Sequence, residues 1–157
     1  MVDVTDKIMK YRDVAYYSGC ALEGSANGYD VSTRAVAKSL GLRIKDVTDW
    51  NCCGAMEVKN VDPGLQTYLS SRVLSNAVNI DHANVVMAPC NGCYHNLKKA
   101  EYDLKNDPKS KETVDRLSAK AGHEAYQAGQ AETIHALDWI KAAIGEESAK
   151  KFLDALT

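Results

Sequence analysis

The sequence predicts an α/β domain with a parallel sheet, helices on the faces of that sheet and a helical carboxyl-terminal tail. Two observations support this prediction. Short apolar segments typical of buried strands alternate with longer segments in which apolar residues recur at helical spacing. A length of 157 residues also suits one ordinary domain with its own core. We therefore expect a single domain over 1–157, with a core at 14–105 and a tail at 109–157.

The first expected unit is a strand, a loop and a helix. Residues 14–17 are apolar and are followed by a Ser-Gly pair, as expected for a short buried strand. Cys20 therefore lies just past the carboxyl end of this strand. After a loop of small residues, apolar side chains recur at helical spacing over 31–40, and Gly41 is a typical helix stop.

The second unit repeats this order. Residues 42–47 alternate apolar with polar side chains, as a half-buried strand does, and lead to Cys52 and Cys53. An Asp-Pro-Gly turn at 62–64 follows, and apolar residues then form one face of a helix over 65–80. A second group of cysteines is thus expected at a strand end.

The third unit is a strand over 84–88 that stops at a proline and continues into Cys90 and Cys93. These two cysteines open a helix that is expected to run to Asn106, before an Asp-Pro pair. The tail is rich in Ala, Lys, Glu and Gln, and we assign no chemistry to it. Its expected helices cover 112–121, 133–144 and 146–156.

Composition narrows the class of protein. Hydrophobic residues make up 45%, charged residues 25%, and the formal net charge is −2, which is typical of a soluble globular protein and argues against nucleic acid as a partner. The charged amino terminus lacks the core of a signal peptide, and no apolar run reaches the roughly 18 residues of a membrane span. We expect a cytoplasmic, reducing location, where cysteines serve as metal ligands or redox thiols.

The five cysteines fall into three groups at the ends of three successive predicted strands. The spacing is Cys, 31 residues, Cys-Cys, 36 residues, Cys-x-x-Cys. Because ligand sites of parallel α/β sheets lie beyond the carboxyl ends of the strands, we expect all five to converge there. A Cys-x-x-Cys pair at a helix amino terminus suits an anionic iron-sulfur cluster.

The adjacent pair leaves alternatives open. Neighbouring side chains on an extended backbone point in opposite directions, so Cys52 and Cys53 need a tight turn to face one metal, and Gly54 permits one. An ordinary cubane takes four cysteines, so the fifth indicates a spare redox thiol or a different cluster. A zinc site of four cysteines and a redox dithiol at Cys90 and Cys93 are the competing interpretations.

The cysteine-bearing segments carry a resemblance to a known family. They are similar to the CCG cysteine-rich domain of the disulfide-cleaving subunit of heterodisulfide reductase, closely over 14–105 and loosely in the tail. The matching residues are Cys20, Asp49-Trp50-Asn51-Cys52-Cys53-Gly54-Ala55 and Pro89-Cys90-Asn91-Gly92-Cys93-Tyr94.

The resemblance implies a cofactor and a reaction. All five cysteines, Cys20, Cys52, Cys53, Cys90 and Cys93, would ligate one noncubane 4Fe-4S cluster. In the family two such domains occur together in a single polypeptide, and their facing clusters cleave a disulfide in one-electron steps. This sequence carries one motif and stops near Thr157, so we expect an amino-terminal half or a natural single-motif version.

The implied function is that of a redox subunit. Electrons would arrive from an iron-sulfur or flavin partner protein and pass to a disulfide, thiol or related sulfur substrate, with a second CCG domain as a further partner. His95, close to Cys93, is a candidate proton donor because histidine titrates near neutral pH. The competing class is a zinc-binding or cluster-binding module that only stabilises the fold or relays electrons.

Overall fold

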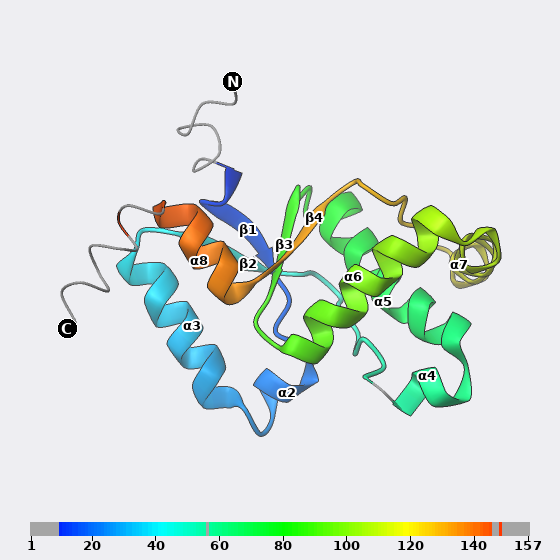
Figure 1. Ribbon diagram of the computed structural model, residues 1–157, viewed down its shortest axis with the longest axis horizontal. Coiled ribbons are helices and arrows are strands. Elements are labelled where there is room, and N and C mark those ends of the chain that lie inside the picture. Colours follow the sequence, from blue (N-terminus) through cyan, green and yellow to red (C-terminus); the bar gives the residue numbers. More distant parts are fainter. Residues whose placement is uncertain (1–9, 56, 146–147, 149–157) are drawn as a thin grey trace.

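A four-stranded parallel sheet forms the centre of the computed structural model, which describes residues 10–55, 57–145 and 148 (Figure 1). The strands lie in the order β2-β1-β3-β4, and every neighbouring pair is parallel. Their bounds are β1 Asp13–Tyr16, β2 Arg43–Asp46, β3 Val85–Ala88 and β4 Glu132–His135. The predicted α/β class with a parallel sheet is therefore confirmed.

Helices cover both faces of the sheet (Figure 1). One apolar cluster packs α5, α6 and α7 on one face, and a second packs α3 and α8 on the other. Within the described residues the helices are α2 Gly19–Glu23, α3 Asn27–Ser39, α4 Glu57–Val61, α5 Pro63–Asn79, α6 Asn91–Asn106, α7 Pro108–Ala121 and α8 Ala136–Ile144.

Strand β1 shows why the sheet is apolar on both faces. Its alternate side chains, Val14 and Tyr16, join the α3 and α8 cluster, whereas Ala15 and the following Tyr17 join the opposite cluster. A strand buried on both sides must be apolar throughout, as the run at 14–17 is. Trp139 of α8 closes one face and donates its indole N–H to the Tyr11 carbonyl at 2.7 Å.

Aspartate and proline set the helix boundaries that the sequence predicted. Asp62 accepts the N–H of Leu65 at 3.0 Å, and a proline occupies the first turn of α5. Asp107 ends α6 and caps α7 by accepting the N–H groups of Lys109 and Ser110. Each Asp-Pro pair therefore separates a helix from the chain before it.

One part of the predicted tail is wrong. The helix expected over 133–144 begins only at 136, and its first residues belong to β4, which pairs with β3 over the register Val85↔Glu132 to Ala88↔His135. Ile134 and the apolar residues of α8 fall at helical spacing, which hid a strand of only four residues. The short helices α2 and α4 were also not predicted, and the helix expected over 146–156 lies, except for position 148, outside the described residues.

The sheet topology creates a crevice at one edge. The chain passes from β1 to β2 in one direction and later from β3 to β4 in the other, so the strand order reverses between β1 and β3. Loops diverge at such a point and leave room for a ligand beyond the carboxyl ends of the strands. Cys20 follows β1 and Cys90 follows β3, so both lie at this crevice.

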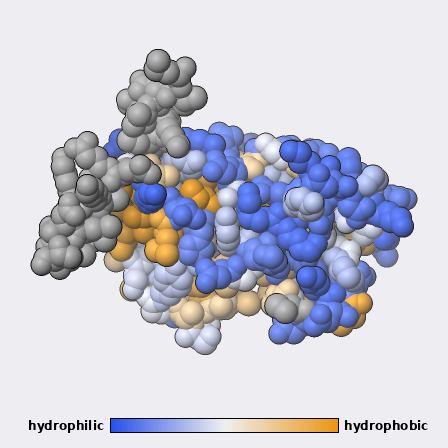
Figure 2. All heavy atoms as spheres, in the orientation of Figure 1, coloured by the Kyte–Doolittle hydropathy of each residue, from blue (hydrophilic) through white to orange (hydrophobic). Residues whose placement is uncertain are grey.

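The surface differs between the two ends of the molecule. Figure 2 shows hydrophilic residues over α6 and α7 and an apolar patch over α8, where the Leu137 side chain is exposed. None of the helices in the described residues combines the length and the apolarity needed to cross a membrane.

Candidate metal centre

All five cysteines lie at the carboxyl edge of the sheet as free thiols. Cys20 is in α2, directly after β1, and Cys52 and Cys53 are in the loop after β2. Cys90 is the amino-terminal cap residue of α6, and Cys93 lies in the first turn of that helix. The prediction that the cysteines follow the strand ends is therefore confirmed.

The thiols come together as two close pairs with Cys90 beside one of them. The Sγ atoms of Cys20 and Cys52 are 3.6 Å apart, and those of Cys53 and Cys93 are 3.7 Å apart. Two thiolates on one tetrahedral metal, with bonds of about 2.3 Å, would lie roughly 3.8 Å apart. Among the described residues, no three His, Cys, Asp or Glu side chains are already arranged around one metal ion.

The adjacent cysteines serve different partners. Cys52 pairs with Cys20 on the exposed side of the rim, and Cys53 pairs with Cys93 in the interior. Gly54 allows this arrangement because its φ of +87° lies in the left-handed region and a Cβ there would be 3.0 Å from Val58 Cβ. The loop thus presents two neighbouring thiols to two levels of the same rim.

Polar contacts from α5 hold the loop that carries this pair. Arg72 forms an ion pair with the Asp49 carboxylate and donates to the Asp49 carbonyl at 2.8 Å and to Asn51 Oδ1 at 2.7 Å. Asn76 donates to the same Asp49 carbonyl at 2.8 Å. Asp49 itself has a φ of +50°, so these bonds hold a backbone conformation that few residues adopt.

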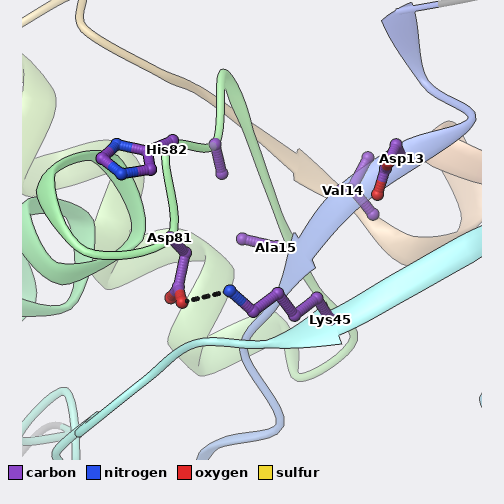
Figure 3. Close-up of a pocket in the computed structure, with 7 residues that line it drawn as sticks. Asp13, Val14, Ala15, Lys45, Asp81 and His82 are labelled. Atoms are coloured by element: carbon purple, nitrogen blue, oxygen red, sulfur yellow. Dashed lines mark ion pairs between the residues drawn. The ribbon is translucent and has the colours of Figure 1, made fainter.

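A buried carboxylate anchors the start of the same loop. Asp81 accepts the Thr48 N–H at 2.8 Å and hydroxyl at 2.7 Å, and pairs with Lys45 at 2.9 Å (Figure 3). Burial opposes ionisation of Asp81, but the Thr48 donors and the Lys45 ammonium lower its pKa. A cavity of ≈ 220 Å³ adjoins this ion pair, between β1, β2 and the loop before β3.

A glycine lets α2 approach the cysteine rim. Gly19 is buried and has a φ of +68°, and a Cβ at this position would lie 2.6 Å from Cys93 Sγ. Any other residue would collide with that sulfur and would also strain the backbone. The site therefore has a cradle in which a main-chain segment without a side chain lies against a thiol.

Hydrogen-bond donors surround the interior sulfur pair. The Asn96 side-chain amide donates to Cys53 Sγ at 3.4 Å and to the Ala55 carbonyl at 3.0 Å. The hydrogen bond shared with Cys93, together with the Asn96 amide and the Ala55 N–H, lowers the pKa of Cys53 despite its burial. That same shared bond, with burial, raises the pKa of Cys93. One sulfur of the pair is thus prepared to carry negative charge.

Tyr17 closes the interior side of the site. Its ring is fully buried, and its hydroxyl donates to the Asn51 carbonyl at 2.8 Å. Burial and the nearby cysteine sulfurs raise the pKa of Tyr17, so the hydroxyl keeps its proton. Its ring also meets that of Trp50 edge to face, with centroids 5.7 Å apart.

Sequence reasoning missed several residues of the site. Asn96 is one helical turn after Cys93, a spacing that places both on one face of α6 and could have identified it. Gly19, Tyr17 and His135 carried no such local signal. His95, the predicted proton donor, is exposed on α6, next to the Asn96 that reaches the sulfur.

The family model of the CCG cysteine-rich domain matches residues 14–98, the segment that carries all five thiols. The chain belongs to this family. The matched residues of this CCG domain end within α6, so β4 and α8 lie beyond them.

Curated relatives of this CCG domain carry the names of redox proteins. The chain is 30% identical over 140 residues to the 8-methylmenaquinol:fumarate reductase membrane anchor subunit of Wolinella succinogenes, covering 89% of this chain and 47% of that protein. It is 30% identical over 143 residues to a subunit of the Ferredoxin/F(420)H(2)-dependent CoB-CoM heterodisulfide reductase of Methanosarcina acetivorans, covering 89% and 46%. The chain thus spans about half the length of the curated relatives it matches.

A solved structure shares the fold. A hypothetical protein from Helicobacter pylori superposes with a TM-score of 0.67 at 15% sequence identity, over 82% of this chain and 25% of that one. At this identity the similarity concerns the architecture alone.

Proposed function

We propose that this CCG domain is an iron-sulfur redox subunit, or part of one, in a heterodisulfide reductase-like complex. The observation that carries the proposal is the gathering of five free thiols from three strand ends on one rim, in a chain that belongs to the CCG family. Relatives named as subunits of heterodisulfide reductases support the redox assignment. The reaction would pass electrons to or from a disulfide, a thiol or a related sulfur substrate.

The proposed ligands are Cys20, Cys52, Cys53, Cys90 and Cys93, and the proposed cofactor is a noncubane 4Fe-4S cluster. The residues present fit such a group. The thiols come in pairs at distances suited to shared metal ions, and the glycine cradle leaves space beside Cys93. When bound, the cluster would supply single-electron storage beside thiolate sulfurs.

The chain's own residues would stabilise and tune the site. Asn96 donates to the Cys53 sulfur, and donors to ligand sulfurs are among the features that set the reduction potential of a cluster. Tyr17 and Trp50 exclude water on the interior side. Cys20 and Cys52 form the exposed side, which is where a substrate or partner would approach. His95 on the exposed face of α6 is the proposed proton donor.

The proposed partners follow from the length of the relatives. Because this chain spans about half of them, catalysis would require a second CCG domain, together with an iron-sulfur or flavin protein that donates electrons. We propose that residues 1–157 act as one such domain and work in the cytoplasm. The isolated chain should then bind its cluster without reducing a heterodisulfide from an artificial donor, and addition of the second domain should restore turnover.

Metal and acid-labile sulfide analysis of the anaerobically purified chain tests the proposal. We expect about four irons and about four sulfides per chain. Electron paramagnetic resonance of the oxidised and reduced protein then distinguishes a noncubane cluster from a cubane. Stoichiometric zinc without sulfide would overturn the proposal and favour a structural metal module instead.

A further inference from the structure

A histidine of the last strand contacts the turn that delivers Cys90. His135 Nε2 lies 2.8 Å from the Pro89 carbonyl oxygen, and His135 Nδ1 lies 3.3 Å from the backbone nitrogen of Leu137. His135 ends β4 and caps the amino terminus of α8. Pro89 immediately precedes Cys90. We propose that His135 is a positioning residue that fixes the orientation of Cys90 at the cysteine rim.

The two bonds require one tautomer. The Leu137 N–H can only donate, so Nδ1 must accept and carry no proton. The Pro89 carbonyl can only accept, so Nε2 must carry the proton and donate it. A neutral imidazole with its hydrogen on Nε2 satisfies both partners at once. The side chain is therefore held at two points and cannot rotate without losing both bonds.

The bond to Pro89 acts on Cys90 through the peptide plane. The Pro89 carbonyl belongs to the same planar unit as the Cys90 nitrogen and Cα, so holding the oxygen fixes the plane. The proline ring already restricts φ at 89. Cys90 is the cap residue of α6 but makes no side-chain capping bond of its own. The hold on this turn comes from β4, 46 residues away in the sequence.

The neighbourhood of His135 supports this role. It pairs with Ala88 at the last position of the β3 and β4 ladder, so the strand delivers it directly beside the turn. Its ring meets the Tyr94 ring edge to face, with centroids 5.7 Å apart. His135 and Cys90 also line the same surface cavity of ≈ 440 Å³. His135 thus lies between the apolar face of α8 and the ligand-bearing end of α6.

Two substitutions separate the two bonds. In His135→Asn, the side-chain oxygen can still accept the Leu137 N–H, and asparagine is a strong helix cap, but no donor reaches Pro89. In His135→Gln, the amide N–H stands near the position of Nε2 and can still donate to the Pro89 carbonyl. His82→Asn is the matched control, because His82 is exposed, lies before β3 at the other end of that strand, and has a φ of +56° that asparagine tolerates.

The first measurement uses the reduced, metal-free chain. Alkylation of Cys90 is followed by mass spectrometry and divided by the rate at Cys20 in the same chain, which cancels global unfolding. Loss of one ordinary hydrogen bond changes a local opening equilibrium about fivefold. We therefore expect the Cys90 ratio to rise about fivefold in His135→Asn. It should remain near the parent value in His135→Gln and in the His82 control.

The second measurement uses the anaerobically loaded chain and rests on the proposed function. The paramagnetic resonance signature should change in His135→Asn and be restored in His135→Gln. Parent-like ratios and spectra in His135→Asn would overturn the proposal. Equal changes in both variants would also overturn it, since they would assign the effect to ring packing. If the parent binds no iron and sulfide, the proposed function fails, but the alkylation ratios still decide the role of His135.

Discussion

Substitution of Gly19 by alanine tests whether the cradle at Cys93 is required. Two effects add at this position. The φ of +68° places a Cβ in a strained conformation, and that Cβ would lie 2.6 Å from Cys93 Sγ, inside contact distance. Gly41 offers a matched control, because its φ is +67° and nothing lies within 4 Å of its Cβ position. Gly41→Ala therefore carries the backbone strain without the collision.

The magnitudes follow from these two effects. Left-handed backbone strain costs about 1–2 kcal/mol for a residue with a Cβ, and this is the expected loss for Gly41→Ala. Forcing an extra methyl group into a packed interior costs about 1–3 kcal/mol more. Gly19→Ala should therefore lose about 2–5 kcal/mol. The collision can be relieved by rotating Cys93 away from Cys53, which would also move a proposed ligand.

Urea unfolding of the reduced, metal-free chain measures these losses, with the slope of the transition checked for each variant. Iron and sulfide uptake under anaerobic conditions gives the second readout. We expect the larger loss of stability and a fall in iron content for Gly19→Ala, and parent-like uptake for Gly41→Ala. Equal destabilisation of the two variants, with equal iron uptake, would refute the reasoning.

Three further predictions concern other parts of the site. Asn96→Ala should shift the reduction potential of the loaded protein, because it removes a donor to the Cys53 sulfur, whereas Asn106→Ala on the exposed end of α6 should leave it unchanged. Cys52→Ser and Cys53→Ser should each lose iron or change the spectrum, and a variant that matches the parent in both would not be a ligand. The folded-state pKa of Asp81 is lowered, so its carboxylate stabilises the fold above its unfolded pKa of about 3.9 and this contribution disappears as the pH falls through the folded value. Asp81→Asn should therefore cost about 1–3 kcal/mol in urea unfolding at neutral pH, with a difference that shrinks below about pH 4, and a difference independent of pH would contradict this account.

The class of fold and the placement of the cysteines could be predicted because both depend on local signals. Apolar runs such as 14–17 and 84–88 are long enough to mark strands, and Asp-Pro pairs mark helix starts. Parallel strands place their carboxyl ends at one edge, so thiols that follow three strands must share that edge. Chain order and periodicity were therefore sufficient to locate the rim.

Short elements required the structure. Strand β4 has only four residues and leads directly into α8, and the apolar spacing of the two together resembles one helix. What makes Glu132–His135 a strand is hydrogen bonding to β3, a partner far away in the sequence. Local propensity carries no record of such a pairing.

The sequence by itself determined an α/β domain with five cysteines at one edge of a parallel sheet. Tertiary structure alone decided that Cys20 pairs with Cys52 and Cys53 with Cys93. It also decided that Gly19 lies against a sulfur and that His135 holds the turn before Cys90. These contacts depend on loop conformation and side-chain direction between residues tens of positions apart. Packing sets both, and the spacing of residues along the chain does not.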